Sequence, residues 1–392
     1  MTQKRIHELS RIYRSQLLDS TIPFWLANGL DREFGGYLTH LDRRGSVFSH
    51  DKAMWFQGRG AWIFSRLCNV VEPREEWLEA ARLGVEFLRG HGFDADGRMF
   101  FLCTRDGRPL RRRRYLFTEH FAAMGLAEYG RAAGDRKALE QAREIFSLIL
   151  EYRRGGRKEQ PKVIAETRSV RGHSDAMIII NTLQVLRSAE VLDGSDALID
   201  EAIEDVFRCF VRPEKKALLE TVGPDGTPIE GAEGRLVNPG HSLETAWFVL
   251  EEARIRNDGR LAERALPVID WSLELGWDAE HGGMFYFIDD RGRAPDKIEW
   301  DMKLWWVHCE ALYATLLAFH LSGEKRFEDW FERIHAWSMD RFPDREYGGW
   351  YGYLHRDGSI ALDIKGNTWK GPFHVPRAQL LLWRLLEEMA AG

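Results

Sequence analysis

Residues 282–319 hold, in one continuous stretch, the pattern that decides the fold of this chain: GGMFYFIDDRGRAPDKIEWDMKLWWVHCEALYATLLAF. A glycine pair is followed by aromatic and β-branched residues around an Asp-x-Gly turn, which predicts a short β-hairpin. The segment from Trp300 onward is apolar on nearly every side, which is typical of a helix buried inside a larger helical assembly. The stretch therefore predicts one unit, a hairpin followed by a buried helix.

The same unit recurs along the chain. Asp-x-Gly or Asp-x-x-Gly turns of this kind occur in YLTHLDRRGSVF (37–48), MFFLCTRDGRPL (99–110), LLETVGPDGTPI (218–229), MFYFIDDRGRAP (284–295) and WYGYLHRDGSIA (350–361). We expect each to form a β-hairpin. Apolar helices are expected to start near residues 51, 115, 172, 238, 300 and 371, although the hairpin before residue 172 is degenerate.

More polar, amphipathic segments lie between these apolar helices, at 75–90, 137–154 and 259–275. Six units of polar outer helix, hairpin and apolar inner helix predict an all-α fold, the (α/α)6 barrel. A solenoid of helix pairs has a similar period but does not explain why unusual polar residues gather at the inner-helix starts. Because no linker interrupts the pattern, we expect a single catalytic domain over residues 1–392, with the hairpins at one mouth.

The composition narrows the class of partner. A net charge of −6 gives no reason to expect nucleic acid or an anionic membrane. The 15 Trp suit either a carbohydrate cleft or a large helical core, and composition alone favours the core. Four scattered cysteines, an N-terminus without an apolar signal segment and no long apolar run predict a cytoplasmic protein.

The starts of the inner helices carry most of the unusual polar residues. The set is Arg59, Glu119, His120, His173, Asp175, His241, Glu244, Lys303, Trp306, His308, Glu310, His374 and Arg377. Each alone is explained by capping, packing or an ion pair. Their concentration on otherwise apolar helices favours a site, because buried ionisable groups need pairing or a function.

His241 and His374 form the best acid/base pair. Each follows a Gly/Pro-rich approach, NPG and KGPF, that directs the side chain into the mouth. An imidazole both takes and gives a proton near neutral pH, as abstraction beside a carbonyl requires. Two such groups on opposite faces of an enediolate invert a carbon, whereas one group serving neighbouring carbons isomerises.

Other chemistries find less support. Neither HExxH nor a close His pair is present, and no phosphate-binding glycine loop is found, so we expect no metal and no required cofactor. The arginine run at Arg108 and Arg111–Arg114 suits an anion site or, more simply, a solvated hairpin edge.

At these residues the chain resembles a known family. DKAMWFQGR, NPGHSLETAWF, WDAEHGGMFYF followed by KIEWDMKLWWVHCEAL, and YGGWYGYLHRDG followed by KGNTWKGPFHVPRA are similar to N-acylglucosamine 2-epimerases over nearly the whole chain. The superfamily also includes cellobiose 2-epimerases, mannose isomerases and a sulfoquinovose-type isomerase. The resemblance implies an (α/α)6 barrel, a cofactor-free epimerisation at C2, possible activation by a nucleotide (ATP), and a homodimer.

The resemblance also implies roles for individual residues. His241 and His374 match the two catalytic histidines, Arg59 matches the arginine that polarises O1 and O2 of the opened sugar, and Glu310 matches the acid beside the histidines. The substrate-binding set is expected to comprise Trp306, Trp369, Arg377, Glu119, Lys303, Glu244 and His173. The isomerase and disaccharide branches tend to carry a further His on the third inner helix, where this chain reads SDAMIIINTL.

The sequence thus predicts a sugar 2-epimerase that interconverts N-acyl-D-glucosamine and N-acyl-D-mannosamine or a related gluco/manno pair. An aldose–ketose isomerase is the main alternative. An inverting glycoside hydrolase on the same barrel needs two carboxylates about 6.5–9.5 Å apart, for which Glu119, Asp175, Glu244 and Glu310 are candidates. A non-catalytic sugar-binding module has little use for two histidines and an arginine at one mouth.

Overall fold

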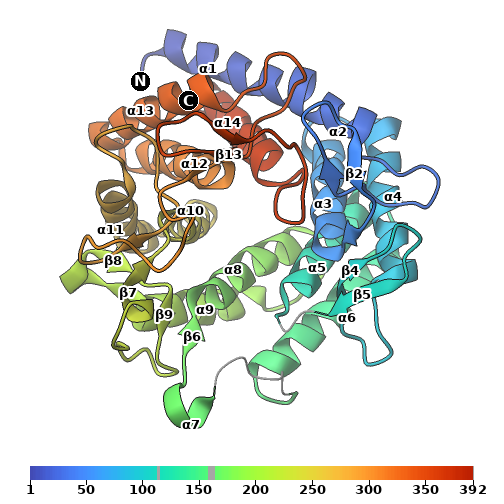
Figure 1. Ribbon diagram of the computed structural model, residues 1–392, viewed down its shortest axis with the longest axis horizontal. Coiled ribbons are helices and arrows are strands. Elements are labelled where there is room, and N and C mark those ends of the chain that lie inside the picture. Colours follow the sequence, from blue (N-terminus) through green and yellow to red (C-terminus); the bar gives the residue numbers. More distant parts are fainter. Residues whose placement is uncertain (113–114, 158–163, 392) are drawn as a thin grey trace.

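The computed structural model describes residues 1–112, 115–157 and 164–391, and its main helices form two concentric rings (Figure 1). The inner ring consists of α3 (Met54–Val70), α5 (Phe117–Ala133), α8 (His173–Ser188), α10 (Pro239–Arg256), α12 (Trp305–Ser322) and α14 (His374–Ala391). The outer ring consists of α1 (Gln3–Ser15), α4 (Glu75–His91), α6 (Arg136–Arg153), α9 (Ser195–Cys209), α11 (Gly259–Gly276) and α13 (Lys325–Arg341). The predicted (α/α)6 barrel is confirmed.

The inner helices are buried on most sides, and each packs mainly on one outer helix, although α5 also contacts α4 and α12 also contacts α11. Where α3 crosses α5, the approach is so close that side chains are excluded. A Cβ on Gly58 would lie 2.4 Å from the Phe121 carbonyl oxygen, and one on Gly125 would lie 2.5 Å from the Gly58 carbonyl oxygen. Glycine is required at both positions because only a residue without a Cβ admits this backbone contact.

The barrel closes through the two ends of the chain. The N-terminal helix α1 is the outer partner of the C-terminal helix α14. Leu41, in the first hairpin, pairs with Gly366, which lies just before α14. No helix within the described residues is both long and apolar enough to cross a membrane.

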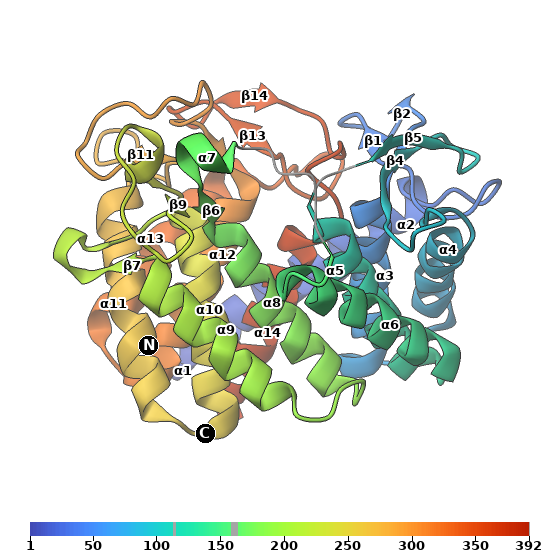
Figure 2. The same ribbon diagram turned by 90° about the horizontal axis from the view of Figure 1, so that it is seen from below.

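Short strands gather at one end of the barrel (Figure 2). Three of the five expected hairpins form: β1 (His40–Leu41) with β2 (Val47–Ser49), β4 (Phe100–Cys103) with β5 (Pro109–Arg112), and β13 (Tyr353–Leu354) with β14 (Ile360–Leu362). Two of these hairpins gain a third strand from the segment directly before an inner helix. β3 (Lys52–Ala53) pairs with β4, and β12 (Lys303–Leu304) pairs with β13.

The other two expected hairpins do not form. In segment 218–229, β8 (Ala217–Leu218) pairs back to β7 (Val211–Arg212), and β9 (Thr221–Val222) pairs with β6 (Arg171–Gly172). In segment 284–295, β11 (Ile288–Asp289) pairs with β10 (Leu236–Val237). In both cases the strand that precedes an inner helix supplies the partner, so these turns join different units. The inner helices start one to five residues later than expected, and a strand lies just before four of them: α3, α8, α10 and α12.

Three loops of the same design brace this end of the barrel: DREFGG (31–36), DAEHGG (278–283) and DREYGG (344–349). In each, both glycines have positive φ and the aspartate N–H donates to the second glycine's carbonyl oxygen over 2.9 Å. Each aspartate is buried and ion-paired with one lysine and one arginine: Asp31 with Lys52 and Arg105, Asp278 with Lys303 and Arg356, Asp344 with Lys365 and Arg43. The ion pairs compensate the cost of burying these charges.

Candidate active site

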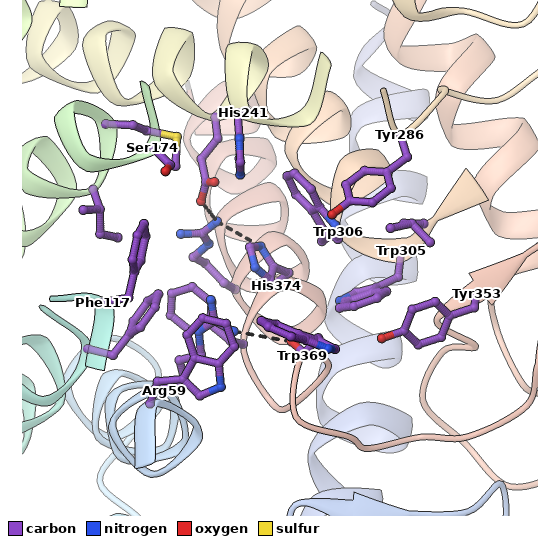
Figure 3. Close-up of a pocket in the computed structure, with 18 of the residues that line it drawn as sticks. Arg59, Phe117, Ser174, His241, Tyr286, Trp305, Trp306, Tyr353, Trp369 and His374 are labelled. Carbon is purple, nitrogen blue, oxygen red and sulfur yellow. Dashed lines mark hydrogen bonds and ion pairs between the residues drawn. The ribbon is translucent and has the colours of Figure 1, made fainter. Parts of the chain in front are cut away.

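A cavity of about 710 Å³ opens at the hairpin end of the barrel, where the inner helices begin. Its lining includes Arg59 from α3, His241 and Glu244 from α10, and His374 and Arg377 from α14. Figure 3 shows Arg59, His241 and His374 projecting into the same space. The prediction that the inner-helix starts share one mouth is therefore confirmed.

His241 lies in the first turn of α10. The helix starts in the way its sequence predicts, since the Asn238 side chain accepts a hydrogen bond from the His241 N–H over 3.1 Å and Pro239 follows the cap. The Nδ1 of His241 lies 3.1 Å from both carboxylate oxygens of Glu220. Because a carboxylate only accepts, Nδ1–H donates to it and Nε2 is left for the cavity.

His374 is the first residue of α14 and has a carboxylate partner of its own. Its Nδ1 lies 2.7 Å from Oε1 of Glu310. The same carboxylate accepts hydrogen bonds from Arg377 Nη2 over 2.8 Å and from the Trp247 indole over 2.8 Å. Arg377 also donates to Glu244 over 2.5 Å. The charge of Glu310 is thus shared between a histidine and an arginine.

The surroundings push the pKa values of the two histidines in opposite directions. Burial lowers the pKa of His374 well below 6.5, and the adjacent Arg377 lowers it further. Burial also disfavours the charged form of His241, but the charge and hydrogen bond of Glu220, together with the charges of Glu244 and Glu310, outweigh burial and raise the His241 pKa above 6.5. A site with one neutral and one protonated imidazole has a general base and a general acid ready together.

Arg59 is a buried cation with unused donors. It is 8% exposed, and its guanidinium carbon lies 4.0, 4.5 and 5.0 Å from the ring centroids of Phe121, Trp55 and Phe373. Its Nε has no hydrogen-bond partner within the described chain, and Nη1 makes one long contact, 3.5 Å, to the Trp369 carbonyl oxygen. Burial lowers the Arg59 pKa to about 9, which leaves it charged at neutral pH. A desolvated guanidinium with free N–H groups is suited to bind a developing oxyanion.

Aromatic side chains form two walls of the cavity. Trp306 contacts both histidines, with ring centroids 5.1 Å from His241 and 5.7 Å from His374, so it fixes the two rings relative to each other. Trp369 is half-exposed at the mouth and meets Trp55 edge-on at 5.3 Å. On the opposite side, Phe117 and Phe121 of α5 and Met177 and Ile178 of α8 line the cavity.

Three residues expected to bind substrate lie outside the lining. Glu119 is buried, and its Oε1 accepts hydrogen bonds from Arg98 Nε over 2.8 Å and the Met99 N–H over 3.0 Å. The Nζ of buried Lys303 lies 3.0 Å from the carboxylate of Asp278, which belongs to the loop at 278–283. His173 is fully buried behind His241. These side chains face their partners rather than the cavity.

Glu119→Gln tests this reassignment. The amide keeps an acceptor for Met99 but removes the charge that pairs with Arg98, so the free energy of unfolding is expected to fall by about 1–3 kcal/mol. The KM for the sugar substrate should stay unchanged. Urea unfolding and steady-state kinetics on the same preparation measure both quantities. A raised KM at unchanged stability would return Glu119 to the binding site.

The remaining sequence candidates have ordinary structural roles. His120 is buried with its Nδ1 2.8 Å from the Thr182 hydroxyl, and His308 stacks on Trp337 at 4.7 Å. Strand β5, which carries the start of the arginine run, is fully exposed, as expected of a solvated edge. Arg113 and Arg114 lie outside the described residues.

Two groups of side chains are close enough to hold a metal ion within the described residues: His173, Glu220 and His241, and Glu244, Glu310 and His374. Arg377 already contacts all three members of the second group, and its charge opposes a further cation. In the first group, ion-pair contacts of 3.1 and 3.6 Å account for the proximity of the ligand atoms without an ion.

Glu220 is the site residue that sequence reasoning missed. It lies between β8 and β9, in the segment expected to form a hairpin of its own. The signal was a single carboxylate in the otherwise apolar run LLETV. Only the actual pairing, β9 with β6 rather than within its own segment, brings Glu220 to His241.

Comparisons with known proteins agree with this geometry. The family model for N-acylglucosamine 2-epimerases matches residues 36–376. The N-acylglucosamine 2-epimerase of Bos taurus is 38% identical over 387 residues, which cover 95% of this chain and 90% of the bovine protein. Cellobiose 2-epimerase from Spirochaeta thermophila DSM 6192 has a TM-score of 0.85 at 25% identity, covering 98% of both chains. A D-mannose isomerase has a TM-score of 0.81 at 16% identity, covers 96% of this chain and 98% of its own, and shows the fold alone. Together with the barrel and its paired histidines, these matches show that the chain belongs to the N-acylglucosamine 2-epimerase family.

Proposed function

We propose that the protein is a sugar 2-epimerase that interconverts N-acyl-D-glucosamine and N-acyl-D-mannosamine. The observation that carries this proposal is the pair His241 and His374. Each ring is oriented by its own carboxylate, both contact Trp306, and both face a cavity that also holds Arg59. An epimerase needs two such groups, because the proton is removed from one face of the carbon and returned to the other.

In the proposed mechanism the sugar ring opens in the cavity. The Nε2 of one histidine then removes the C2 proton, and the C1 carbonyl oxygen takes up negative charge. Arg59 stabilises this oxyanion, and loss of one such donor typically costs about 3 kcal/mol. The Nε2 of the other histidine protonates C2 of the resulting enolate on the opposite face. Glu220 and Glu310 keep the two rings oriented throughout.

The apolar side of the cavity supports an N-acyl substituent at C2. Met177 and Ile178 of α8 and Phe117 and Phe121 of the neighbouring helix α5 all line the cavity. A hydroxyl at C2 would leave this surface without a complementary group, whereas an acyl methyl packs against it.

Met177→Ala is therefore expected to lower the ratio of kcat/KM for N-acetylglucosamine to that for glucose about tenfold, because the acyl methyl loses apolar contact. Steady-state kinetics with both sugars measure the ratio. Met124→Ala is the matched control, since Met124 is buried on α5 outside the cavity lining. An equal fall in the control, or an unchanged ratio in Met177→Ala, would remove the acyl role from Met177.

Incubation in deuterated water with N-acetylglucosamine, mannose, glucose, cellobiose and sulfoquinovose tests the function, with NMR of the products. The proposal requires the gluco/manno pair of an N-acyl sugar with deuterium at C2. A ketose product would instead indicate an aldose–ketose isomerase. Release of reducing ends from a glycoside would indicate a hydrolase, although Glu310 and Glu244 are tied to Arg377 and Asp175 lies in a different groove.

The proposal includes further features that rest on the residues and on the family resemblance. The chain acts as one catalytic domain over residues 1–392, without a required cofactor or metal, so a chelator arm of the same assay should leave activity unchanged. A homodimer and stimulation by a nucleotide such as ATP follow from the family resemblance. All four cysteines lie in described parts of the chain and are unpaired, which agrees with a reducing, cytoplasmic compartment.

A further inference from the structure

Glu220 is held where it can act on His241. Its N–H donates to the Leu236 carbonyl oxygen over 2.9 Å, and its own carbonyl oxygen accepts from the His173 N–H over 2.9 Å. Leu236 lies in the strand that leads into α10, and His173 is the first residue of α8. The backbone of Glu220 is thus bonded to the approaches of two inner helices, and its side chain bridges a histidine on each.

The side chain of Glu220 contacts two histidines, and one of these contacts a threonine in turn. Both oxygens of Glu220 lie 3.1 Å from His241 Nδ1, and Oε1 lies 3.6 Å from His173 Nδ1. The Nε2 of His173 lies 3.0 Å from the hydroxyl of Thr245, one turn after His241 on α10. If the hydroxyl donates to Nε2, the proton of the neutral His173 ring is on Nδ1, directed at Glu220. Burial lowers the pKa of His173, which keeps it neutral.

The two histidine–carboxylate pairs differ in charge. Glu310 pairs with Arg377 as well as with His374, so its negative charge is largely compensated. Within the described residues, Glu220 pairs with His173 and His241 and with no lysine or arginine. Other charged or titratable groups near His241 are Glu244, Glu310 and His374, with Arg377 behind them and Arg59 in the same cavity.

From this arrangement we propose that Glu220, anchored by His173, is a positioning residue that keeps His241 as the protonated member of the histidine pair. His374, whose carboxylate is shared with an arginine, is then the neutral member. In the resting enzyme His241 is therefore the imidazolium, and His374 is the neutral imidazole. This role rests on the proposed function and explains how the two histidines take complementary states before substrate binds.

The pH dependence of kcat/KM is the test, because a purely structural role would not move it. Because activity requires one protonated and one neutral histidine, kcat/KM plotted against pH is bell-shaped. The alkaline limb of this profile reports loss of the proton from His241. Glu220→Gln removes the charge that favours this proton, so the alkaline limb should move to lower pH. The shift must be equal in both directions of the reaction, because their ratio of kcat/KM equals the equilibrium constant. A shift of about one pH unit lowers kcat/KM about tenfold on the alkaline side.

Glu128→Gln is the matched control. Glu128 is also a fully buried inner-helix carboxylate, held by Arg66 and Asn69 of α3 near the C-terminal end of α5, whereas the histidines lie at helix starts. Its replacement should lower stability without moving either limb. Glu220→Asp keeps the charge and should return the alkaline limb toward its wild-type position.

A second measurement does not depend on turnover. NMR titration of ring-labelled histidine, with the His241 signal assigned by its absence in His241→Asn, follows the His241 pKa in the substrate-free protein. In Glu220→Gln this titration should move to lower pH. An unmoved His241 titration in folded Glu220→Gln would overturn the role of Glu220, as would a titration in Glu220→Asp that moves as far as in Glu220→Gln. If wild-type protein epimerises none of the sugars but the titration shifts, only the proposed function fails.

Discussion

His241→Asn and His374→Asn are each expected to lose net epimerisation, by at least the 10²- to 10⁴-fold that a general acid or base contributes. Each variant leaves the partner histidine with its own carboxylate, Glu310 or Glu220, intact. The remaining imidazole can still remove the C2 proton from one epimer and return solvent deuterium to the same face. One variant should therefore label only the gluco sugar and the other only the manno sugar, which NMR in deuterated water detects.

Asn preserves the approximate size of the histidine side chain and its capacity for hydrogen bonding. Circular dichroism checks the fold of each variant. If ring opening also depends on one histidine, that variant loses both exchanges, and a pre-opened analogue restores the single exchange. Near-normal epimerisation by either variant would show that the two-histidine mechanism is wrong for this protein.

Arg59→Met is expected to lower kcat about 10²- to 10³-fold while leaving the protein at least as stable as wild type. The loss of kcat follows from removing the guanidinium that meets the developing oxyanion. The stability follows from burial, because Arg59 is desolvated among three aromatic rings with one long hydrogen bond and an unpartnered Nε. Replacing a poorly compensated buried charge with an apolar side chain relieves its desolvation cost.

Arg212→Met is the matched control for this prediction. Arg212 is also 8% exposed, but its guanidinium donates to the backbone carbonyls of Val211, Cys209 and Gly226. Its loss should lower the free energy of unfolding and leave kcat unchanged. Denaturant unfolding and kcat on the two variants separate the effects. An Arg59→Met protein that unfolds more easily yet keeps its kcat would show that Arg59 has a structural role and does not stabilise the oxyanion.

The fold followed from the sequence because its signals are local and repeated. The apolar inner helices and the polar outer helices carry their burial pattern in their own residues, and the period places the helices in order around a ring. The histidines were found for a similar reason. NPGH and KGPFH are local helix-start signals that direct a side chain into the mouth whatever its neighbours are.

The tertiary structure decided which polar residues belong to the site. Glu119 is a carboxylate near a helix start, as Glu244 is, and Lys303 lies in the strand just before α12, but their partners, Arg98 and Asp278, come from other segments and turn them away from the cavity. Glu220 shows the converse, because a pairing between β6 and β9 brings it to His241. Pairing between distant strands and long-range ion pairs depends on the closed ring rather than on any local pattern. The sequence by itself therefore determined the barrel and its two histidines, whereas the carboxylate partner of His241, Glu220, was decided by contacts that exist only after the ring closes.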